Sequence, residues 1–127
     1  MSTVALSEAT FADTVKGNDI VLIDFWAEWC GPCRMFGPVY EKASESNGDI
    51  VFAKVDTEAE PGLAGAFGIS SIPTLMAIRE GVVLYSQAGA LPEHALTQLI
   101  QAVRDVDMEE VRSSIASEQA AAESSDA

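Results

Sequence analysis

Cys30 and Cys33 are the residues whose type and spacing most clearly indicate chemistry, and the chain contains no other cysteine. They lie within DFWAEWCGPCRMFGP, residues 24–38, separated by Gly31 and Pro32. Two thiols at this spacing can close and reopen a disulfide by thiol–disulfide exchange. We expect Cys30 to end a strand at the surface, where the N–H groups and dipole of the following helix favour its thiolate. Cys30 would then attack a substrate disulfide, and Cys33, shielded on the core-facing side of that helix, would resolve the mixed disulfide.

Two other interpretations of the cysteine pair are weaker. A zinc site needs about four ligands, and beyond the cysteines the chain offers only His94, which we place on the solvated face of a predicted helix. No metal is therefore expected. A structural staple is the second alternative, but closing so short a loop stabilises a protein by only about 2 kcal/mol. Redox catalysis is favoured over both.

Asp24 is the second residue with chemical potential, because it stands inside an apolar run, between Ile23 and Phe25. Burial of an unpaired carboxylate raises its pKa, which suits a general base that takes the proton of Cys33. The alternative is an ordinary carboxylate at a strand edge with a backbone partner. Lys54, in VFAKVD, is the predicted charge partner on a neighbouring strand, although its side chain could instead reach the surface.

Composition limits the possible partners and compartments. The chain of 127 residues suits one domain, and its net charge of −13 opposes binding to nucleic acid or anionic membranes. No apolar run is long enough to span a bilayer, and the N-terminal MSTVALSEATFADTV lacks the basic and apolar regions of a secretory signal. We therefore expect a cytoplasmic protein, in which a permanent disulfide is rare. Nothing in the sequence indicates more than a monomer.

The elements that must position these residues follow from periodicity and turn chemistry. The run DIVLIDFWAE is apolar on both faces, as in a central strand covered by helices on both sides. Glu80-Gly81 forms a tight turn between two antiparallel strands. The predicted order is strand 3–6, helix 8–16, strand 19–28, helix 31–46 with a kink at Pro38, strand 49–56, a weak helix in 57–68, two strands within 73–89, and helix 91–106. This order predicts an α/β domain, a central mixed sheet with helices on both faces.

The composition changes after the last predicted helix. Residues 1–106 are predicted to form the domain, and residues 107–127 an acidic, Ala-, Ser- and Glu-rich tail. The spacing of Val111 and Ile115 permits a frayed helical turn. A solvated, largely disordered and flexible tail is nevertheless the expectation.

Four segments in this order closely resemble thioredoxin: DFWAEWCGPCRM, AKVDTE, FGISSIPTL and QAGAL. The resemblance runs from about residue 3 to residue 106 and is specific, because it joins W-C-G-P-C to an upstream Asp and a downstream I-P-T. It implies the thioredoxin fold, with Asp24 as the family's buried acid and Lys54 as its neighbouring lysine. It also implies a cis peptide bond before Pro73, although only about one X–Pro bond in twenty is cis.

The resemblance also implies a function and a docking surface. That function is general protein-disulfide reduction without a bound cofactor, in which a thioredoxin reductase passes electrons from NADPH and oxidised proteins receive them. An extended substrate segment would pair with backbone beside the cysteines. Trp26 is expected to support the site from the core. The residues implied in substrate docking are Trp29, Gly31, Pro32, Ile72, Pro73, Ala88, Gly89 and Ala90.

The sequence departs from the thioredoxin pattern in two features, and it leaves two alternative functions open. Arg34 stands where many thioredoxins have lysine, and the tail is additional. One alternative is an oxidase or isomerase on the same fold, although Gly31 and Pro32 between the cysteines resemble the reducing members. The other is a binding module that uses the apolar surface without turnover. A Cys33→Ser variant would separate that module from the enzymes.

Overall fold

The computed structural model describes residues 2–125. The strands are β1 (Thr3–Ala5), β2 (Ile20–Trp26), β3 (Val51–Asp56), β4 (Thr74–Arg79) and β5 (Val82–Ala88). The helices are α1 (Glu8–Lys16), α2 (Gly31–Ser46), α3 (Pro61–Ala66), α4 (Glu93–Asp105) and α5 (Met108–Ser125). The predicted order of elements through α4 is confirmed.

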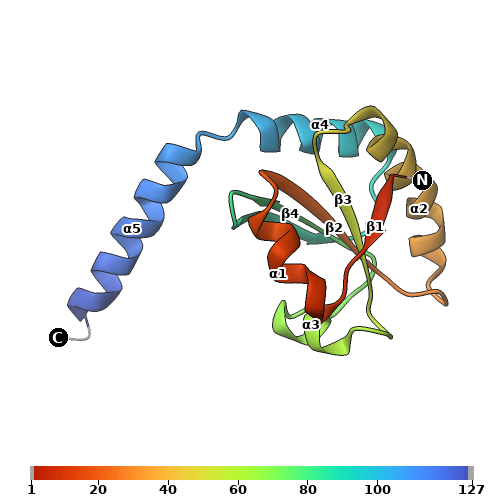
Figure 1. Cartoon of the computed structure of the whole chain (residues 1–127), viewed down its shortest axis with the longest axis horizontal. Coiled ribbons are helices and arrows are strands. Elements are labelled where there is room, and N and C mark those ends of the chain that lie inside the picture. Colours follow the sequence, from red (N-terminus) through yellow and green to blue (C-terminus); the bar gives the residue numbers. More distant parts are fainter. Residues whose placement is uncertain (1, 126–127) are drawn as a thin grey trace.

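The five strands form one mixed sheet in the order β1-β3-β2-β4-β5 (Figure 1). β3 pairs in parallel with β1 and β2, whereas β4 is antiparallel to both β2 and β5. The parallel connections need crossover helices, and α1 and α2 supply them. The central position of β2 places Asp24 in the middle of the sheet, opposite Lys54 in the β3 register.

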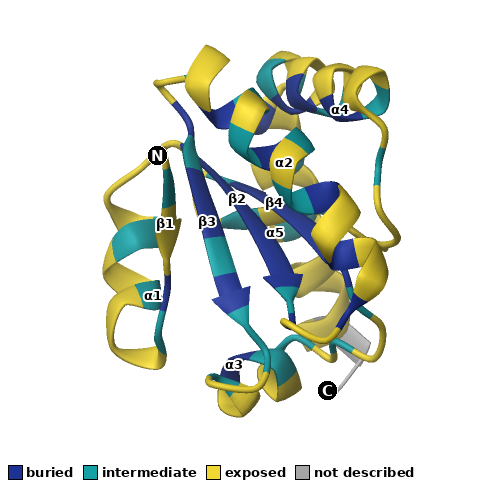
Figure 2. Cartoon of the chain, turned by 90° about the vertical axis from the view of Figure 1, so that its right-hand side faces the viewer, coloured by how far each residue is buried: buried dark blue, intermediate teal, exposed yellow. Residues whose placement is uncertain are grey.

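Helices cover both faces of the sheet, as the apolar pattern of β2 predicts (Figure 2). On one face, Phe36 and Tyr40 of α2 and Ile100 of α4 pack on Leu22 of β2. On the other face, α1 and α3 pack on a second cluster that includes Ile23. Because successive strand residues point to opposite faces, Asp24 points to the same face as Leu22, under α2.

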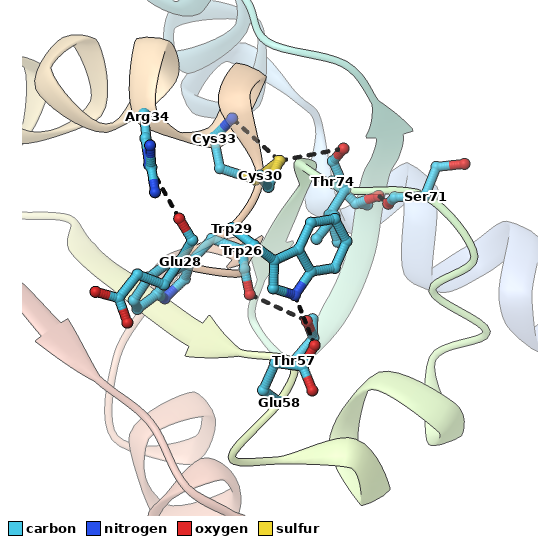
Figure 3. Close-up of a disulfide and its surroundings, with 11 residues drawn as sticks. Trp26, Glu28, Trp29, Cys30, Cys33, Arg34, Thr57, Glu58, Ser71 and Thr74 are labelled. Carbon is cyan, nitrogen blue, oxygen red and sulfur yellow. Dashed lines mark hydrogen bonds between the residues drawn. A yellow bond between two sulfur atoms is a disulfide. The ribbon is translucent and has the colours of Figure 1, made fainter.

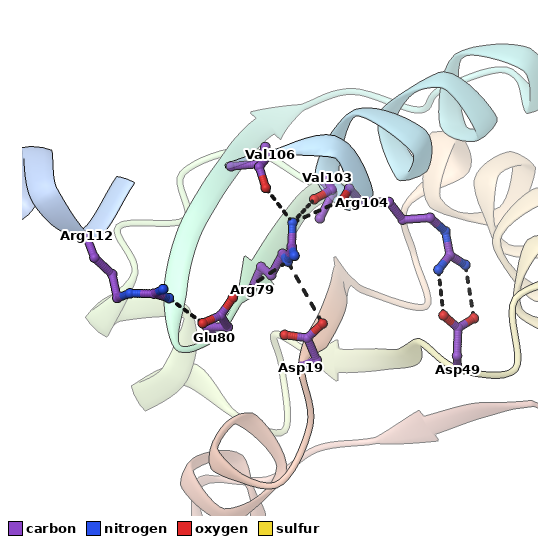
Figure 4. Close-up of polar contacts among 8 residues, drawn as sticks. All are labelled: Asp19, Asp49, Arg79, Glu80, Val103, Arg104, Val106 and Arg112. Carbon is purple, nitrogen blue, oxygen red and sulfur yellow. Dashed lines mark hydrogen bonds and ion pairs between the residues drawn. The ribbon is translucent and has the colours of Figure 1, made fainter. Parts of the chain in front are cut away.

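Specific polar contacts hold the ends of two helices. α1 begins after Ser7, whose backbone N–H donates to Thr10 Oγ1 at 3.0 Å. At the end of α4, Arg79 Nη1 donates to the carbonyl oxygens of Val103 and Arg104, each at 3.1 Å, and of Val106 at 2.8 Å (Figure 4). A side chain from β4 therefore satisfies carbonyls that lack partners within the helix.

α5 corrects the prediction of a largely irregular tail, because Met108–Ser125 is helical and extends away from the sheet (Figure 1). Asp107 Oδ1 accepts hydrogen bonds from the backbone N–H groups of Glu109 at 3.0 Å and Glu110 at 3.2 Å, as a helix N-cap does. The segment is rich in alanine and glutamate, which favour helices. The predicted flexibility of residues 107–127 relative to residues 1–106 stays a prediction.

The first turns of α5 lie near the edge strand β5. Val111 and Ile115 line one side of a groove of about 510 Å³, and Val82 and Val83 line the other. Arg112 forms an ion pair with Glu80 (Figure 4). Within residues 2–125, no helix is both long and apolar enough to cross a membrane.

Candidate active site

Cys30 and Cys33 form a disulfide at the N-terminus of α2, with their Cα atoms 5.2 Å apart (Figure 3). Cys30 is the N-cap of the helix, and its Sγ accepts a hydrogen bond from the backbone N–H of Cys33 at 3.2 Å. The predicted start of the helix at Gly31 is confirmed. The N–H donor and the helix dipole both stabilise negative charge on the Cys30 sulfur.

Two expectations about the cysteines are wrong. β2 ends at Trp26, so a turn over residues 27–30 separates Cys30 from the strand. Cys30 is also no more exposed than Cys33, since their exposed fractions are 4% and 5%. Both pack with Ala27, and Trp26 and Ile72 contact this cluster. The burial arises because loop 69–73 approaches the sulfur from another part of the chain, which local periodicity could not reveal.

The segment before β4 forms one side of the sulfur site. Cys30 Sγ lies 3.7 Å from the carbonyl oxygen of Ile72. The Ile72–Pro73 peptide bond is cis, which confirms the bond implied by the resemblance. Pro73 is buried, whereas Ile72 is half-buried and remains accessible. Pro73 therefore lies beneath the surface that a substrate would contact.

The end of β5 joins the same surface. Ala88 pairs in register with Thr74, and the backbone N–H of Gly89 donates to the Pro73 carbonyl oxygen at 2.8 Å. Gly89 has a φ of 116°, a conformation that a residue with a side chain adopts only with strain. Of the eight residues predicted to dock substrate, six are exposed: Trp29, Gly31, Pro32, Ala88, Gly89 and Ala90.

Trp29 is held by a contact that the sequence did not predict. Its indole Nε1 donates to Glu58 Oε1 at 2.7 Å, and Glu58 lies in the turn after β3 (Figure 3). Thr57 joins the same turn to β2, because its backbone N–H and Oγ1 donate to the Trp26 carbonyl at 2.9 Å and 3.1 Å. No sequence motif identifies Glu58 as part of the site.

Asp24 is buried on the α2 side of β2, with an exposed fraction of 1%. Neither carboxylate oxygen has a hydrogen-bond partner among the described residues. Burial raises the pKa of Asp24 to about 7, and the positive charge of Lys54 only partly opposes this shift. Burial, and secondarily the charge of Asp24, raises the pKa of Tyr40, whose hydroxyl donates to the Ala53 carbonyl at 2.7 Å.

Lys54 is near Asp24 but is not bonded to it. The two residues pair in register, yet the Lys54 Nζ lies over the Trp26 ring, 4.7 Å from its centroid. The predicted charge partnership is therefore a through-space effect on the carboxylate. Trp26 is half-buried beneath the cysteines, as expected for core support.

A small cavity of about 180 Å³ lies between Cys33 and Lys54, and Asp24 is not part of its lining. Its lining includes Cys33, Lys54, Trp26 and Arg34. A space of this size can hold a few water molecules. It offers a path for a proton between the α2 thiol and solvent beside Lys54.

The described part of the chain has no candidate metal site, because no three His, Cys, Asp or Glu side chains are grouped so that they could hold an ion. His94 is exposed on α4. Arg34, the predicted departure from the family, uses its Nε to donate to the Glu28 carbonyl at 3.0 Å (Figure 3).

Comparison with known proteins supports the family that the two cysteines and their surroundings indicate. The family model "Thioredoxin" matches residues 2–102. The chain is 64% identical over 121 residues to the Streptomyces coelicolor protein named "Putative thioredoxin 2", covering 95% of this chain and 90% of that protein. It is 46% identical over 89 residues to a thioredoxin of Chlorobaculum thiosulfatiphilum, covering 69% and 82% of the two chains.

Solved structures agree as well. A mutant thioredoxin of Halobacterium salinarum superposes with a TM-score of 0.76 at 34% identity, covering 83% of this chain and 92% of that one. A Plasmodium falciparum thioredoxin gives 0.73 at 35% identity, with 79% and 97% covered. Sequence, sheet order and the Cys30–Cys33 disulfide point the same way, and the chain belongs to the thioredoxin family of thiol–disulfide oxidoreductases.

Proposed function

We propose that this protein is a general protein-disulfide reductase that receives electrons from NADPH through a thioredoxin reductase and passes them to oxidised proteins. The observation that carries the proposal is a disulfide capping α2, surrounded by exposed backbone and an exposed tryptophan and backed by a buried carboxylate. The dithiol itself holds the two electrons, so no bound cofactor is needed.

The first step is the attack of the Cys30 thiolate on one sulfur of a substrate disulfide. A sulfur–sulfur bond forms between Cys30 and the substrate, and the other substrate sulfur leaves as a thiolate that takes a proton from water. The N–H of Cys33 and the α2 dipole lower the cost of the attacking thiolate. Substrate backbone would align beside Ile72 and Gly89, with Trp29, Gly31, Pro32, Ala88 and Ala90 around it.

The second step requires Cys33 to lose its proton inside the protein. We assign this proton to Asp24, whose pKa of about 7 allows it to accept and release protons near neutral pH. Asp24 lies in register with Lys54, which lines the cavity at Cys33. The Cys33 thiolate then attacks Cys30 Sγ and expels the second substrate thiolate, which also takes a proton from water. The substrate gains two electrons and two protons, and the enzyme ends as the disulfide.

The test is a coupled assay with NADPH, a bacterial thioredoxin reductase and insulin as the disulfide substrate. NADPH oxidation should require this protein, the reductase and insulin together, and the Cys30→Ser variant should abolish it. A reduced protein that leaves insulin disulfides intact would contradict the proposal. Failure of one reductase with normal reduction of insulin by the pre-reduced protein would contradict only the electron source.

The remaining assignments belong to the same proposal. A monomer in the cytoplasm fits a reductase that must meet many partners in a reducing compartment. The net charge of −13 disfavours nucleic acid and anionic membranes as partners. Sedimentation of the oxidised and reduced forms would test the monomer directly.

A further inference from the structure

Trp29 is the only exposed residue among the Phe, Tyr and Trp side chains of the described part of the chain, with an exposed fraction of 67%, and it directly precedes Cys30. An exposed tryptophan normally samples several rotamers, and ordering it costs entropy. Here Nε1, the one polar atom of the ring, donates to Glu58 Oε1 at 2.7 Å. A short hydrogen bond to a carboxylate is stronger than one between neutral groups. Glu58 therefore sets the direction of the ring beside the disulfide.

The turn that carries Glu58 is itself held in place. Asp56 Oδ1 accepts from the backbone N–H groups of Glu58 at 2.9 Å and Ala59 at 3.4 Å. Thr57 binds the Trp26 carbonyl, which ties the turn to the strand that leads to Cys30. These bonds hold the backbone of Glu58 in place. The hydrogen bond to Trp29 therefore joins the turn after β3 to the segment that leads to Cys30 (Figure 3).

Glu58 is not paired with either of the cations on the neighbouring elements, Arg34 and Lys54. Glu58 and Glu28 are exposed on this side of the cysteines, and Glu58 has no ion-pair partner among the described residues. The guanidinium of Arg34 is directed to the Glu28 carbonyl. One Glu58 oxygen is used by Trp29 and the other is free of described partners. A substrate segment that docks over Trp29 would meet an uncompensated carboxylate.

We propose that Glu58 is a specificity-determining residue of this reductase: it positions Trp29 through Oε1 and favours disulfides flanked by lysine or arginine through its charge. The inference rests on the proposed function. Substitution separates the positioning role from the charge role. Glu58→Gln keeps an acceptor for the indole and removes the charge, whereas Glu58→Ala removes both.

The test uses pre-reduced protein and three disulfide-linked peptides that differ in one flanking residue, Lys, Gln or Glu, with the reaction followed by stopped-flow fluorescence at low salt. Wild type should react with the Lys peptide about threefold faster than with the Glu peptide, the size of one exposed charge pair. Glu58→Gln should lose this ratio and slow the Gln peptide less than Glu58→Ala does, because the amide still accepts from the indole. Glu58→Ala should lose the ratio and slow the Gln peptide severalfold.

Glu45→Gln is the matched control, because it removes the same charge from an exposed position on α2. The inference is overturned if Glu58→Gln keeps the same Lys-to-Glu ratio as Glu45→Gln, or if Glu58→Ala matches wild type with the Gln peptide. No reductase is present, so failure of wild type with all three peptides would instead contradict the proposed function.

Discussion

Asp24 and Lys54 face one another across β2 and β3, but the ammonium group lies 4.7 Å from the centroid of the Trp26 ring and not on the carboxylate. Asp24 therefore remains buried without a hydrogen-bond partner among the described residues. The lysine charge lowers the cost of ionising Asp24 only in part, since burial keeps the pKa at about 7. A carboxyl group in this state can move a proton at neutral pH.

The raised pKa of Asp24 predicts how stability depends on pH. The ordinary pKa is 3.8, so between pH 4 and 7 the unfolded chain has lost a proton that the folded chain still binds. The free energy of unfolding should therefore fall as pH rises through this window. The total loss attributable to Asp24 is about 4 kcal/mol by pH 8. Urea unfolding of the oxidised protein, in which the cysteines do not titrate, measures it.

Asp24→Asn supplies the control for this pH dependence. The variant has no proton to lose, so its stability relative to wild type should increase between pH 4 and pH 8. A constant difference across that range would show that Asp24 ionises normally and is not the proton acceptor.

Replacement of the resolving cysteine should stop the reaction halfway. Cys33→Ser keeps Cys30 at the N-cap of α2 but removes the thiol that breaks the mixed disulfide. We expect the variant to accumulate covalent complexes with protein substrates and to turn over less than one thousandth as fast. Non-reducing electrophoresis measures the complexes, and Cys30→Ser is the control that should form none. Unchanged turnover in Cys33→Ser would favour a binding module.

Arg79 should contribute more to stability than other arginines, because one nitrogen donates to three carbonyls at the end of α4. Arg79→Met should lower the free energy of unfolding by about 2–3 kcal/mol. Arg112→Met is the matched control, since it breaks only the exposed pair with Glu80 and should cost less than about 1 kcal/mol. Equal losses of unfolding free energy in the two variants, measured in urea, would contradict the role of Arg79 as a cap of α4 (Figure 4).

Local patterns predicted the elements that depend on local chemistry. The helix at Gly31 begins where predicted because Pro32 and the N-cap are local signals. Residues 108–125 are helical although their composition is acidic, because helix propensity and the capping by Asp107 favour a helix there. An aspartate with glutamates two and three residues later, as in Asp107, Glu109 and Glu110, is a local signal for the start of a helix.

The site was less predictable than the fold because its contacts join distant segments. The equal burial of Cys30 and Cys33 depends on residues 69–73, and the direction of Trp29 depends on Glu58. The cis bond at Pro73 was implied by family resemblance and not by composition. Neither the partner of an exposed indole nor the position of a lysine ammonium follows from periodicity.

The domain boundary gives a further prediction. A chain that ends at Met108 keeps the buried Met108 side chain and all contacts of Arg79 with α4. It should reduce disulfides at the wild-type rate and lose at most about 2 kcal/mol of stability, because residues 109–123 are exposed or half-buried. A change of more than tenfold in the rate would show that α5 is part of the catalytic unit.

The reduction potential of the Cys30–Cys33 pair distinguishes a general reductase from a protein that donates or rearranges disulfides. Equilibration of the protein with defined ratios of reduced and oxidised dithiothreitol, followed by alkylation and mass measurement, would determine it. A general reductase should have a potential of about −270 mV, the thioredoxin value, at which the dithiol is a good electron donor. A value of about −120 to −180 mV would contradict the reductase and indicate a protein that donates or rearranges disulfides.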